Sequence, residues 1–542
     1  MIIILTVCKK AHQFVLHIMT TFTENGATSY EANDPLLKLF YHALRDTPET
    51  SMREMVTTAW NGNLSEESME QLRQRRLLVL RCLFHLRWCR GGKGERKQFL
   101  TGMDQLIELG AGDNVLANLR EIPHFGYWRD MLHFFGTELE PAMLQIYTNQ
   151  LCADVGNLQL GGEHLKNVSL AGKWAPSPGK EMDRKHRAVA KFCQRMGLIE
   201  AAYRKNYIVP LRKHLRIVET QMCDDDWENI NYEHVPSLAR LKYNSAFQKH
   251  DPTRFAAYMT AVAEGKAKMN IKLVFPYQLV QAFVDGTTDE TSLNVMWDEL
   301  VRQTREKLLG DNSNAERLQG LAVADLSGSM TFPNNVPWLN AVALSLLWSE
   351  LCEGRFKGHC YVFSRTATLL KIEGATFCER VHFMQRYSEI ANTNLQAVFN
   401  DMLTHATAWS VPRNLYPKRL YIFTDGQFDT MTNGSSVSNL EETERKHHRA
   451  GYPLPEIVFW NLRGDIVDFP APGDRRGVAM VSGFSDSLLQ LLLTGKPLNP
   501  VSLMLDALDT PELQRVKLAD DVCLCELQDA IGCNVPNCIW KQ

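Results

Sequence analysis

The sequence predicts an all-α part followed by a doubly wound α/β part, and three observations support this. From Pro35 to about Gln319, apolar residues recur three and four positions apart in successive segments, which is typical of consecutive helices. After Gln319, apolar runs of strand length alternate with helical segments, which indicates a mainly parallel sheet covered by helices. A polar loop, Asp325 to Ser329, directly follows the first of these strands.

Short breaks rich in Gly, Pro, Asn or Asp divide the helical part. The predicted helices span residues 35–45, 72–88, 99–109, 115–119, 127–135, 141–152, 183–196, 199–215, 237–249, 252–264, 276–284 and 293–308. Antiparallel helices in succession, with no strands between them, favour a helical-repeat array. No strict period is present, so any repeats are degenerate.

Strands and helices alternate in the second part. The predicted strands span 321–324, 359–363, 368–372, 419–423, 456–460 and 478–481, and the helices span 338–351, 377–387, 395–406, 438–450 and 486–493. Only four residues join 359–363 to 368–372, so this pair must be an antiparallel hairpin. We assign the helical part to 34–317, the α/β part to 318–495, a disordered extension to 1–33 and a C-terminal tail to 496–542. Within the extension, residues 1–18 are expected to add nothing to the fold.

The composition is that of an ordinary globular protein, with 542 residues, 45% of them hydrophobic and 22% charged, and a net charge of -3. This net charge argues against a wholly basic nucleic-acid coat. The thirteen cysteines are scattered and several lie in apolar segments, which favours free thiols in a reducing, cytoplasmic compartment. No segment reaches about eighteen uninterrupted apolar residues, so we expect a soluble protein without a membrane partner.

The tail carries the cysteine pattern C-x-C-x7-C-x4-C, at Cys523, Cys525, Cys533 and Cys538. Four thiolates could hold zinc. This spacing matches no standard zinc finger or ribbon, and no histidine accompanies it. Zinc is therefore the disfavoured interpretation of these residues.

Small oxygen-bearing side chains lie at three loops of the predicted sheet. Asp325, Ser327 and Ser329 follow the first strand, Thr393 precedes the helix at 395–406, and Asp425 follows a second buried strand. Open α/β sheets bind ligands at the carboxyl ends of their strands, and carboxylate and hydroxyl oxygens suit Mg²⁺ (or Mn²⁺). The competing interpretation is ordinary turn chemistry, because Asp and Ser also dominate turns.

The order of these residues, D-x-S-x-S, then Thr, then Asp, resembles the metal-ion-dependent adhesion site of von Willebrand factor A domains. All five positions of that site are filled. The resemblance implies an A domain that binds Mg²⁺ (or Mn²⁺) and, through the ion, a carboxylate offered by a protein partner. The alternative is a relic of such a site that binds no ion.

Positive charge is concentrated in two islands of the helical part. Residues 71–97 hold nine basic residues and one acid, and residues 166–216 hold thirteen basic and three acidic residues. The RNA-binding candidates in these islands are Arg87, Arg90, Lys93, Arg96, Lys97, Lys173, Trp174, Lys185, Arg187, Arg204, Lys205, Arg212 and Lys213. Cationic side chains can neutralise phosphates and aromatic ones can stack bases. A solvated helix face is the other interpretation of such charge runs.

Several segments, among them RGGKGER (90–96), SLAGKWAPS (169–177) and VFWNLRG (458–464), resemble an uncharacterised family of fungi, plants and large viruses. That family is similar in architecture to the TROVE-domain Ro autoantigen. The resemblance implies a HEAT-like helical domain that closes around a basic hole, followed by an A domain. It also implies binding of structured or misfolded small RNA.

These observations favour a non-enzymatic RNA-binding scaffold, a ribonucleoprotein component with a Mg²⁺-binding A domain. The alternative is a metal-dependent protein interaction adaptor that binds no RNA, because helical arrays and A domains both commonly bind proteins. A metal-dependent hydrolase is the weakest of the three hypotheses. No general base is arranged beside the metal loop, and most of the direct ligands would be hydroxyls.

Overall fold

The computed structural model describes residues 34–62, 67–310, 318–363, 367–387, 394–426, 439–465, 474–485, 488–493 and 498–522, and the backbone of 19–22 and 28–31. In the N-terminal extension, β1 (Met19–Phe22) pairs antiparallel with β2 (Thr28–Glu31). The expected disorder of 1–33 is therefore wrong for these two segments, whose Thr, Phe and Tyr residues favour strands. Residues 1–18 lie outside the described part of the chain.

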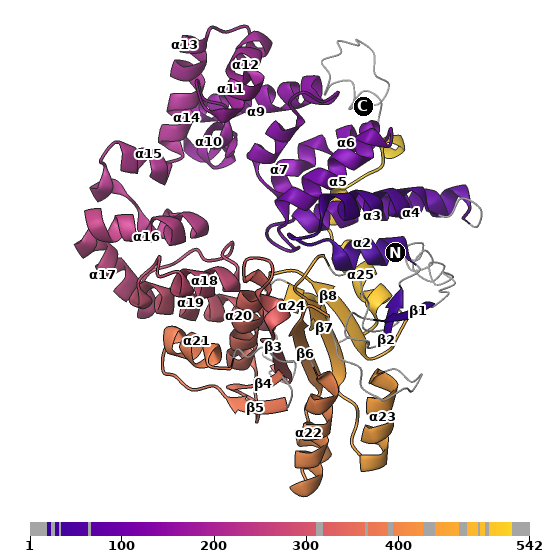
Figure 1. Cartoon of the computed structure of the whole chain (residues 1–542). Coiled ribbons are helices and arrows are strands. Elements are labelled where there is room, and N and C mark those ends of the chain that lie inside the picture. Colours follow the sequence, from indigo (N-terminus) through magenta and orange to yellow (C-terminus); the bar gives the residue numbers. More distant parts are fainter. Residues whose placement is uncertain are drawn as a thin grey trace.

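The first part of the chain is helical, and its helices follow one another from α2 to α19 (Figure 1). They are α2 (Pro35–His42), α3 (Glu49–Asn61), α4 (Met69–Arg87), α5 (Arg96–Glu108), α6 (Gly112–Ala117), α7 (Ile122–Phe125), α8 (Trp128–Met131), α9 (Glu140–Leu160), α10 (Ala171–Trp174), α11 (Glu181–His186), α12 (Ala188–Met196), α13 (Glu200–Tyr203), α14 (Val209–His214), α15 (Val218–Cys223), α16 (Ser237–His250), α17 (Pro252–Ala263), α18 (Pro276–Val284) and α19 (Glu290–Leu309). Among the described helices, none is long and apolar enough to span a membrane.

The structure differs from the predicted helices at α3 and at residue 187. Helix α3 was not predicted, although Met52, Met55 and Trp60 lie on one buried face at helical spacing. The predicted helix 183–196 is two helices, α11 and α12. The break falls at Arg187, which has a left-handed backbone with φ of 52° and therefore cannot continue a right-handed helix.

Polar caps set the starts of two long helices, α4 and α19. The Ser68 side chain accepts from the Gln71 amide at 3.3 Å and the Gln71 side chain accepts from the Ser68 amide at 2.8 Å, so α4 begins with a capping box. The Asp289 carboxylate accepts from the Ser292 amide at 2.8 Å at the start of α19. Each cap satisfies amide groups that have no partner within the helix.

The second part holds a six-stranded sheet in the order β5-β4-β3-β6-β7-β8. Its strands are β3 (Leu321–Asp325), β4 (His359–Phe363), β5 (Ala367–Lys371), β6 (Arg419–Thr424), β7 (Glu456–Asn461) and β8 (Val478–Ser482). All neighbours are parallel except β4 and β5, which form an antiparallel hairpin. The predicted mainly parallel sheet and its hairpin are confirmed.

Helices cover both faces of this sheet. They are α20 (Val336–Leu351), α21 (Phe377–Gln385), α22 (Leu395–Ala408), α23 (Asn439–Ala450) and α24 (Leu488–Leu492). Successive residues of β3 point to opposite faces. Ala322 belongs to the hydrophobic cluster that contains α20, and Val323 belongs to the separate cluster that contains α22. The central strands are consequently buried on both sides, which explains their continuous apolar sequences.

The first helices of the helical part lie next to the sheet domain, and the chain comes back beside that domain at α18 and α19 (Figure 1). The two ends of the helical part meet at Arg45, which pairs with Glu95 at 3.1 Å and donates to the hydroxyl of Tyr277. The same guanidinium lies 5.2 Å from the ring centre of Phe484 in the α/β part. The helices therefore trace a closed path, and the sheet domain lies at its closing point.

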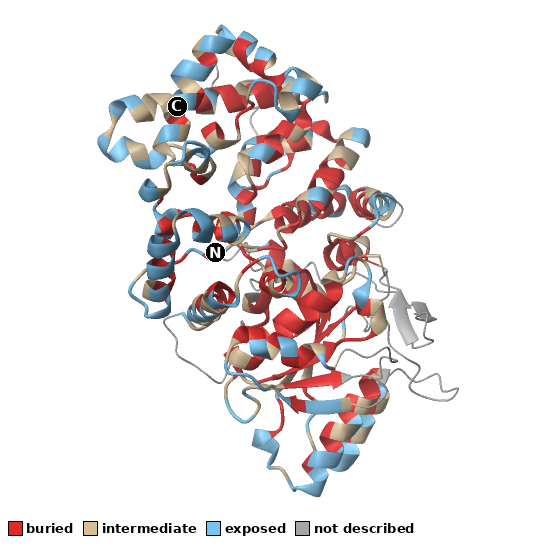
Figure 2. Ribbon diagram, turned by 60° about the vertical axis from the view of Figure 1, so that its left-hand side comes forward, coloured by how far each residue is buried: buried red, intermediate tan, exposed pale blue. Residues whose placement is uncertain are grey.

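The C-terminal segment is part of this closure. Helix α25 (Pro500–Leu508) packs against α2, α4 and β8. Beyond it, the Lys517 amide donates to the Asn118 side chain at 2.9 Å, and the Ala519 amide donates to Asn114 at 3.0 Å. Figure 2 shows buried residues concentrated in the sheet domain and in the helices next to it. The four tail cysteines considered for zinc lie outside the described residues.

Candidate metal centre and nucleic-acid interface

The predicted metal loop lies at the carboxyl end of β3. The Asp325 carboxylate accepts from the Ser327 amide at 3.0 Å, which folds the loop back toward the end of the strand. The Ser327 and Ser329 hydroxyl oxygens lie 3.1 Å apart. On the neighbouring strand, the Thr424 hydroxyl donates to the second oxygen of Asp325 at 2.9 Å. The two strands thus present Asp325, both serines and Asp425 at one edge of the sheet.

The two carboxylates of this edge are almost completely buried, with Asp325 0% and Asp425 1% exposed. Burial first, and the charge of Asp425 second, raise the pKa of Asp325 to about 7, against the opposing hydrogen bonds from Ser327 and Thr424. Two buried carboxylates close together are costly unless a cation compensates them. The edge is therefore suited to hold positive charge.

An arginine that the sequence did not single out supplies part of that charge. Arg463, in the loop after β7, directs one guanidinium nitrogen at Asp425 Oδ2 and at the Ser329 carbonyl, both at 3.3 Å. Its other nitrogens form a bidentate pair with Asp465 at 2.9 and 2.8 Å. Asp325 and Asp425 lie at the edge itself, and Asp465 joins them only through the Arg463 guanidinium, so the carboxylates outnumber the cation.

The donor set fits a hard divalent cation. Carboxylate and hydroxyl oxygens are the ligands that Mg²⁺ accepts, and the excess negative charge would be offset by such an ion. Within the described ranges, no group of three or more His, Cys, Asp or Glu side chains could hold a metal, so a site here would depend on the serine hydroxyls. Thr393, the fifth predicted ligand, lies outside the described residues.

Two predicted RNA-binding residues of the first basic island are in the interior. Arg87 is buried and pairs with Asp130 at 2.7 Å. Lys93 is also buried, and its amino group donates to the carbonyls of Phe40 and Ala43 and, at 2.7 Å, to the hydroxyl of Ser482. Both cations therefore have their hydrogen-bond and ion-pair partners inside the protein. Their prediction as RNA contacts is therefore corrected to a structural role.

The rest of the first island reaches the surface only in part. Arg90 and Lys97 are exposed. Arg96 is 42% exposed but pairs with Asp130 at 2.5 Å. Trp88 is half-buried and packs edge-on against Phe125, with ring centres 6.0 Å apart. The first island therefore has fewer exposed cations that could contact a phosphate than its composition suggested.

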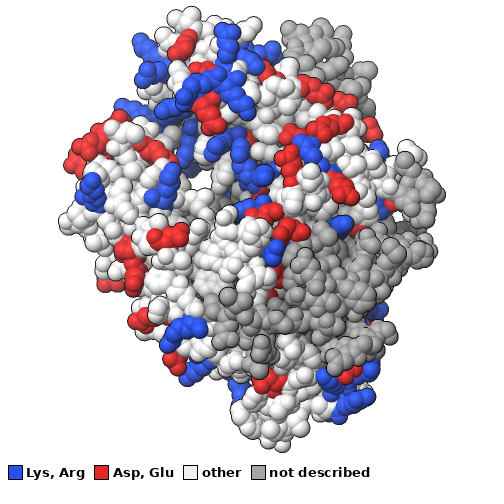
Figure 3. All heavy atoms as spheres, viewed as in Figure 1, with Lys and Arg blue, Asp and Glu red and all other residues white. Residues whose placement is uncertain are grey.

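The second island is mostly exposed. Its exposed candidates are Lys185, Arg187, Arg204, Lys205 and Lys213. Lys173 is partly buried and lies 3.7 Å from Glu219. Trp174 is half-buried, with its ring 6.0 Å from that of Tyr127. Figure 3 shows Lys and Arg side chains gathered on the upper helices, around a hollow in the middle of that face.

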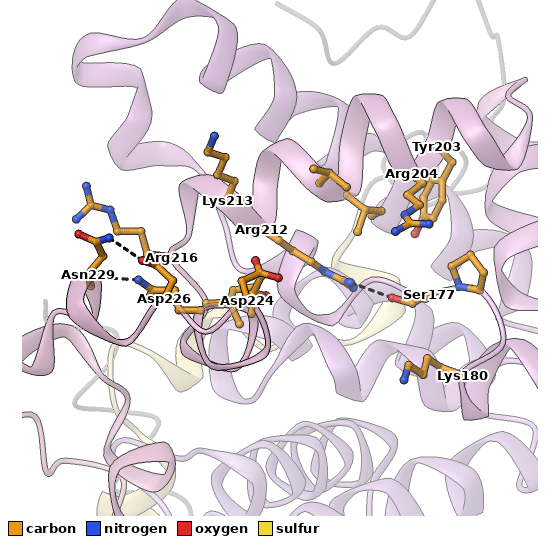
Figure 4. A pocket seen from close by; sticks show the side chains of 16 residues that line it. Ser177, Lys180, Tyr203, Arg204, Arg212, Lys213, Arg216, Asp224, Asp226 and Asn229 are labelled. Carbon is orange, nitrogen blue, oxygen red and sulfur yellow. Dashed lines mark hydrogen bonds between the residues drawn. The ribbon is translucent and has the colours of Figure 1, made fainter. Parts of the chain in front are cut away.

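A cavity of about 890 Å³ opens within this second island (Figure 4). Its charged lining residues are Lys180, Arg204, Arg212, Lys213, Arg216, Asp224 and Asp226. Arg212 is held in place, because its guanidinium donates to the Gly172 and Ala175 carbonyls and to the Ser177 hydroxyl at 2.9 to 3.0 Å. Lys180 and Arg216 were not among the predicted residues, although both lie within the predicted island.

Cations outnumber acids by five to two in the lining of this cavity. Among the residues that the structure describes, Lys180, Arg204 and Lys213 make no ion pair. Burial lowers the pKa of Arg212, and its hydrogen-bond acceptors are neutral. Positive charge that no carboxylate neutralises raises the local potential and attracts anions.

The matches to known proteins cover both parts of the chain. Residues 319–514 match a domain of unknown function (DUF7788), and residues 194–309 match a second domain of unknown function (DUF2828). The chain is also 25% identical over 525 residues to an uncharacterized protein, L728, of Acanthamoeba polyphaga mimivirus. That similarity covers 90% of this chain and 87% of the viral protein, so it spans the helical and the α/β parts together.

Proposed function

We propose that this protein is a non-enzymatic RNA-binding scaffold with a divalent-cation site in its α/β domain. The observation that carries the proposal is the cavity of about 890 Å³ in the second basic island. Five cationic and two acidic side chains line it. Its volume falls within the range of roughly 300–1,000 Å³ that is usual for small-ligand clefts, so a nucleotide segment is a suitable occupant.

The lining offers both kinds of contact that single-stranded RNA needs. Arg204, Lys213 and Arg216 are exposed cations that could each neutralise a phosphate. Ile208, Val209 and Ile217 give the same cavity an apolar surface against which a ribose or a base could lie. Because the helices follow a closed path, this surface would lie on that path, next to the hollow seen in Figure 3.

The finer architecture belongs to the same proposal. Successive helices on a closed path support a HEAT-like array of the TROVE type. The parallel sheet with its loop of Asp325, Ser327 and Ser329 supports a von Willebrand factor A-like domain. When bound there, Mg²⁺ or Mn²⁺ would supply a Lewis-acidic centre for a carboxylate of a protein partner. A cytoplasmic location goes with this proposal.

The salt dependence of RNA binding tests the proposal. We expect the affinity of the full chain for a hairpin RNA with a single-stranded overhang to fall steeply between about 50 and 200 mM salt, with a slope of about 0.7–0.9 for each phosphate neutralised. Changing all five exposed candidates of the second island to glutamate should remove most of that slope. Fluorescence anisotropy measures both quantities.

The matched control reverses five other exposed lysines, Lys249, Lys268, Lys272, Lys371 and Lys418. These changes alter the net charge by a similar amount but leave the second island intact. Distant exposed charges are screened beyond about 8 Å at physiological salt, so the slope should remain. If RNA binding is weak and equally indifferent to both sets, the scaffold proposal fails. Capture of an acidic protein that depends on the second island would then favour the adaptor.

A further inference from the structure

Arg463 occupies the oxygen-rich edge at which the proposed cation would bind. It lies in the loop after β7, while Asp325 follows β3 and Asp425 follows β6. One of its guanidinium nitrogens lies 3.3 Å from Asp425 Oδ2 and 3.3 Å from the Ser329 carbonyl. Its side chain is 13% exposed. A guanidinium this close to Asp425 and a divalent ion on the same carboxylate would repel each other strongly.

We propose that Arg463 is an internal competitor that sets the divalent-cation affinity of this edge. In the cation-free protein its guanidinium provides the positive charge beside Asp425. A divalent ion that reaches Asp425 must displace that guanidinium. The inference rests on the proposed cation site and adds a residue that the D-x-S-x-S, Thr and Asp pattern does not contain.

The contacts of Arg463 are unequal, and this makes displacement possible. The bonds to Asp465 are bidentate, at 2.9 and 2.8 Å, whereas both contacts at the cation edge are 3.3 Å long. Bidentate guanidinium–carboxylate pairs are the stronger and better oriented kind. Asp465 can therefore keep the guanidinium when Asp425 exchanges it for a metal ion.

Close contacts hold the backbone of Arg463 and Gly464, so the exchange is confined to the side chain. The Arg463 amide donates to the Asn461 side chain at 2.8 Å. Gly464 is pressed against the helical part, where an added Cβ would lie 2.4 Å from the Thr47 hydroxyl oxygen and 2.9 Å from Leu44. Because residues 463 and 464 are held against the helical part, displacement of the guanidinium needs only a rotation of the Arg463 side chain.

Calorimetric titration of the full chain with Mn²⁺ tests this role. Arg463→Gln removes the competing charge and should tighten Mn²⁺ binding by about tenfold or more. Arg463→Lys keeps a charge at the edge and should leave the affinity near that of the wild type. Asp465→Asn removes the carboxylate that would keep the guanidinium once Asp425 releases it, so Mn²⁺ should bind more weakly.

The control is Arg475→Gln, which removes an arginine of the same domain that pairs with Glu444 on α23. It should not change Mn²⁺ affinity, and thermal unfolding of each variant verifies that it folds. If the wild type binds Mn²⁺ and Arg463→Gln binds no more tightly, the competitor role is overturned while the cation site stands. If neither protein binds Mn²⁺, the cation site itself is overturned, and the role of Arg463 with it.

Discussion

Arg87 and Asp130 form an ion pair of 2.7 Å in the interior of the helical part, with exposed side-chain fractions of 2% and 0%. Asp130 also accepts from the Tyr127 amide at 3.0 Å and pairs with Arg96. One buried carboxylate thus joins the end of α4, the start of α5 and the start of α8. The pair explains why a residue from a strongly basic segment does not face solvent.

Arg87→Met should therefore destabilise the protein without affecting RNA binding. Removing one partner of a buried pair leaves the other charge short of compensation, and the usual loss is about 3–5 kcal/mol. Because Arg96 also contacts Asp130, we expect about 3 kcal/mol, measured by urea unfolding. The control Lys97→Met, at an exposed position, should change stability by less than about 0.5 kcal/mol. Lower RNA affinity with unchanged stability would contradict the structural role.

Trp88 and Trp174 should respond differently to replacement by alanine. Trp88 packs against Phe125, and a Cβ added at Gly91 would meet its ring, so Trp88→Ala should lower the melting temperature and leave RNA affinity unchanged. Trp174 lies in the second island, with the Lys173 amino group 5.6 Å from its ring. If a base stacks there, Trp174→Ala should cost about 1–3 kcal/mol of RNA affinity. Equal RNA affinities for the two variants would argue against stacking.

His85 should make the protein sensitive to mild acid. Burial first and the charge of Lys93 second lower the pKa of His85 to about 3, and its ring nitrogens have no hydrogen-bond partner within the described part. The unfolded chain protonates this residue near pH 6.5, so its contribution to stability is present above that pH and is lost as the pH falls toward 3. Between pH 7 and 5 the loss is about 2 kcal/mol.

Replacing His85 by leucine tests this assignment, because leucine cannot be protonated. We expect the unfolding free energy of His85→Leu to fall less between pH 7 and pH 5 than that of the wild type. His164, which lies on the exposed 3₁₀ turn Gly162–Asn167, serves as the matched control. His164→Leu should keep the acid sensitivity of the wild type. Parallel pH profiles for the wild type and His85→Leu would show that another group causes the loss.

Sequence patterns were sufficient for the strands and for the placement of the loop predicted to bind a metal. Buried parallel strands such as β3 and β6 are continuous apolar runs, and the carboxyl ends of neighbouring parallel strands share an edge. Asp325 and Asp425 were therefore expected together. Arg463 was not expected there. It contacts Ser329, which lies 134 residues away in the sequence, and its own segment shows no metal-ligand spacing.

The sequence also did not reveal which group each basic residue contacts. Arg87 and Arg204 both lie in strongly basic segments, yet Arg87 is buried against Asp130 and Arg204 is exposed at the cavity. Charge density in a sequence gives the number of cations but not their acceptors, which come from distant elements. The acceptors of Lys93 lie on α2, in the turn after it and at the end of β8, so only the folded chain identifies them.

Asp325→Asn should have opposite effects on cation binding and on the stability of the cation-free protein. Asparagine keeps an oxygen that can accept from the Ser327 amide but removes one of two buried negative charges, so the cation-free variant should unfold at a higher temperature than the wild type. The same change should abolish Mn²⁺ binding and its stabilisation, which for the wild type is about 2.7 kcal/mol at a hundredfold excess over Kd. Calorimetry with and without Mn²⁺ measures both effects. A variant that still gains stability from Mn²⁺ would place the ion elsewhere.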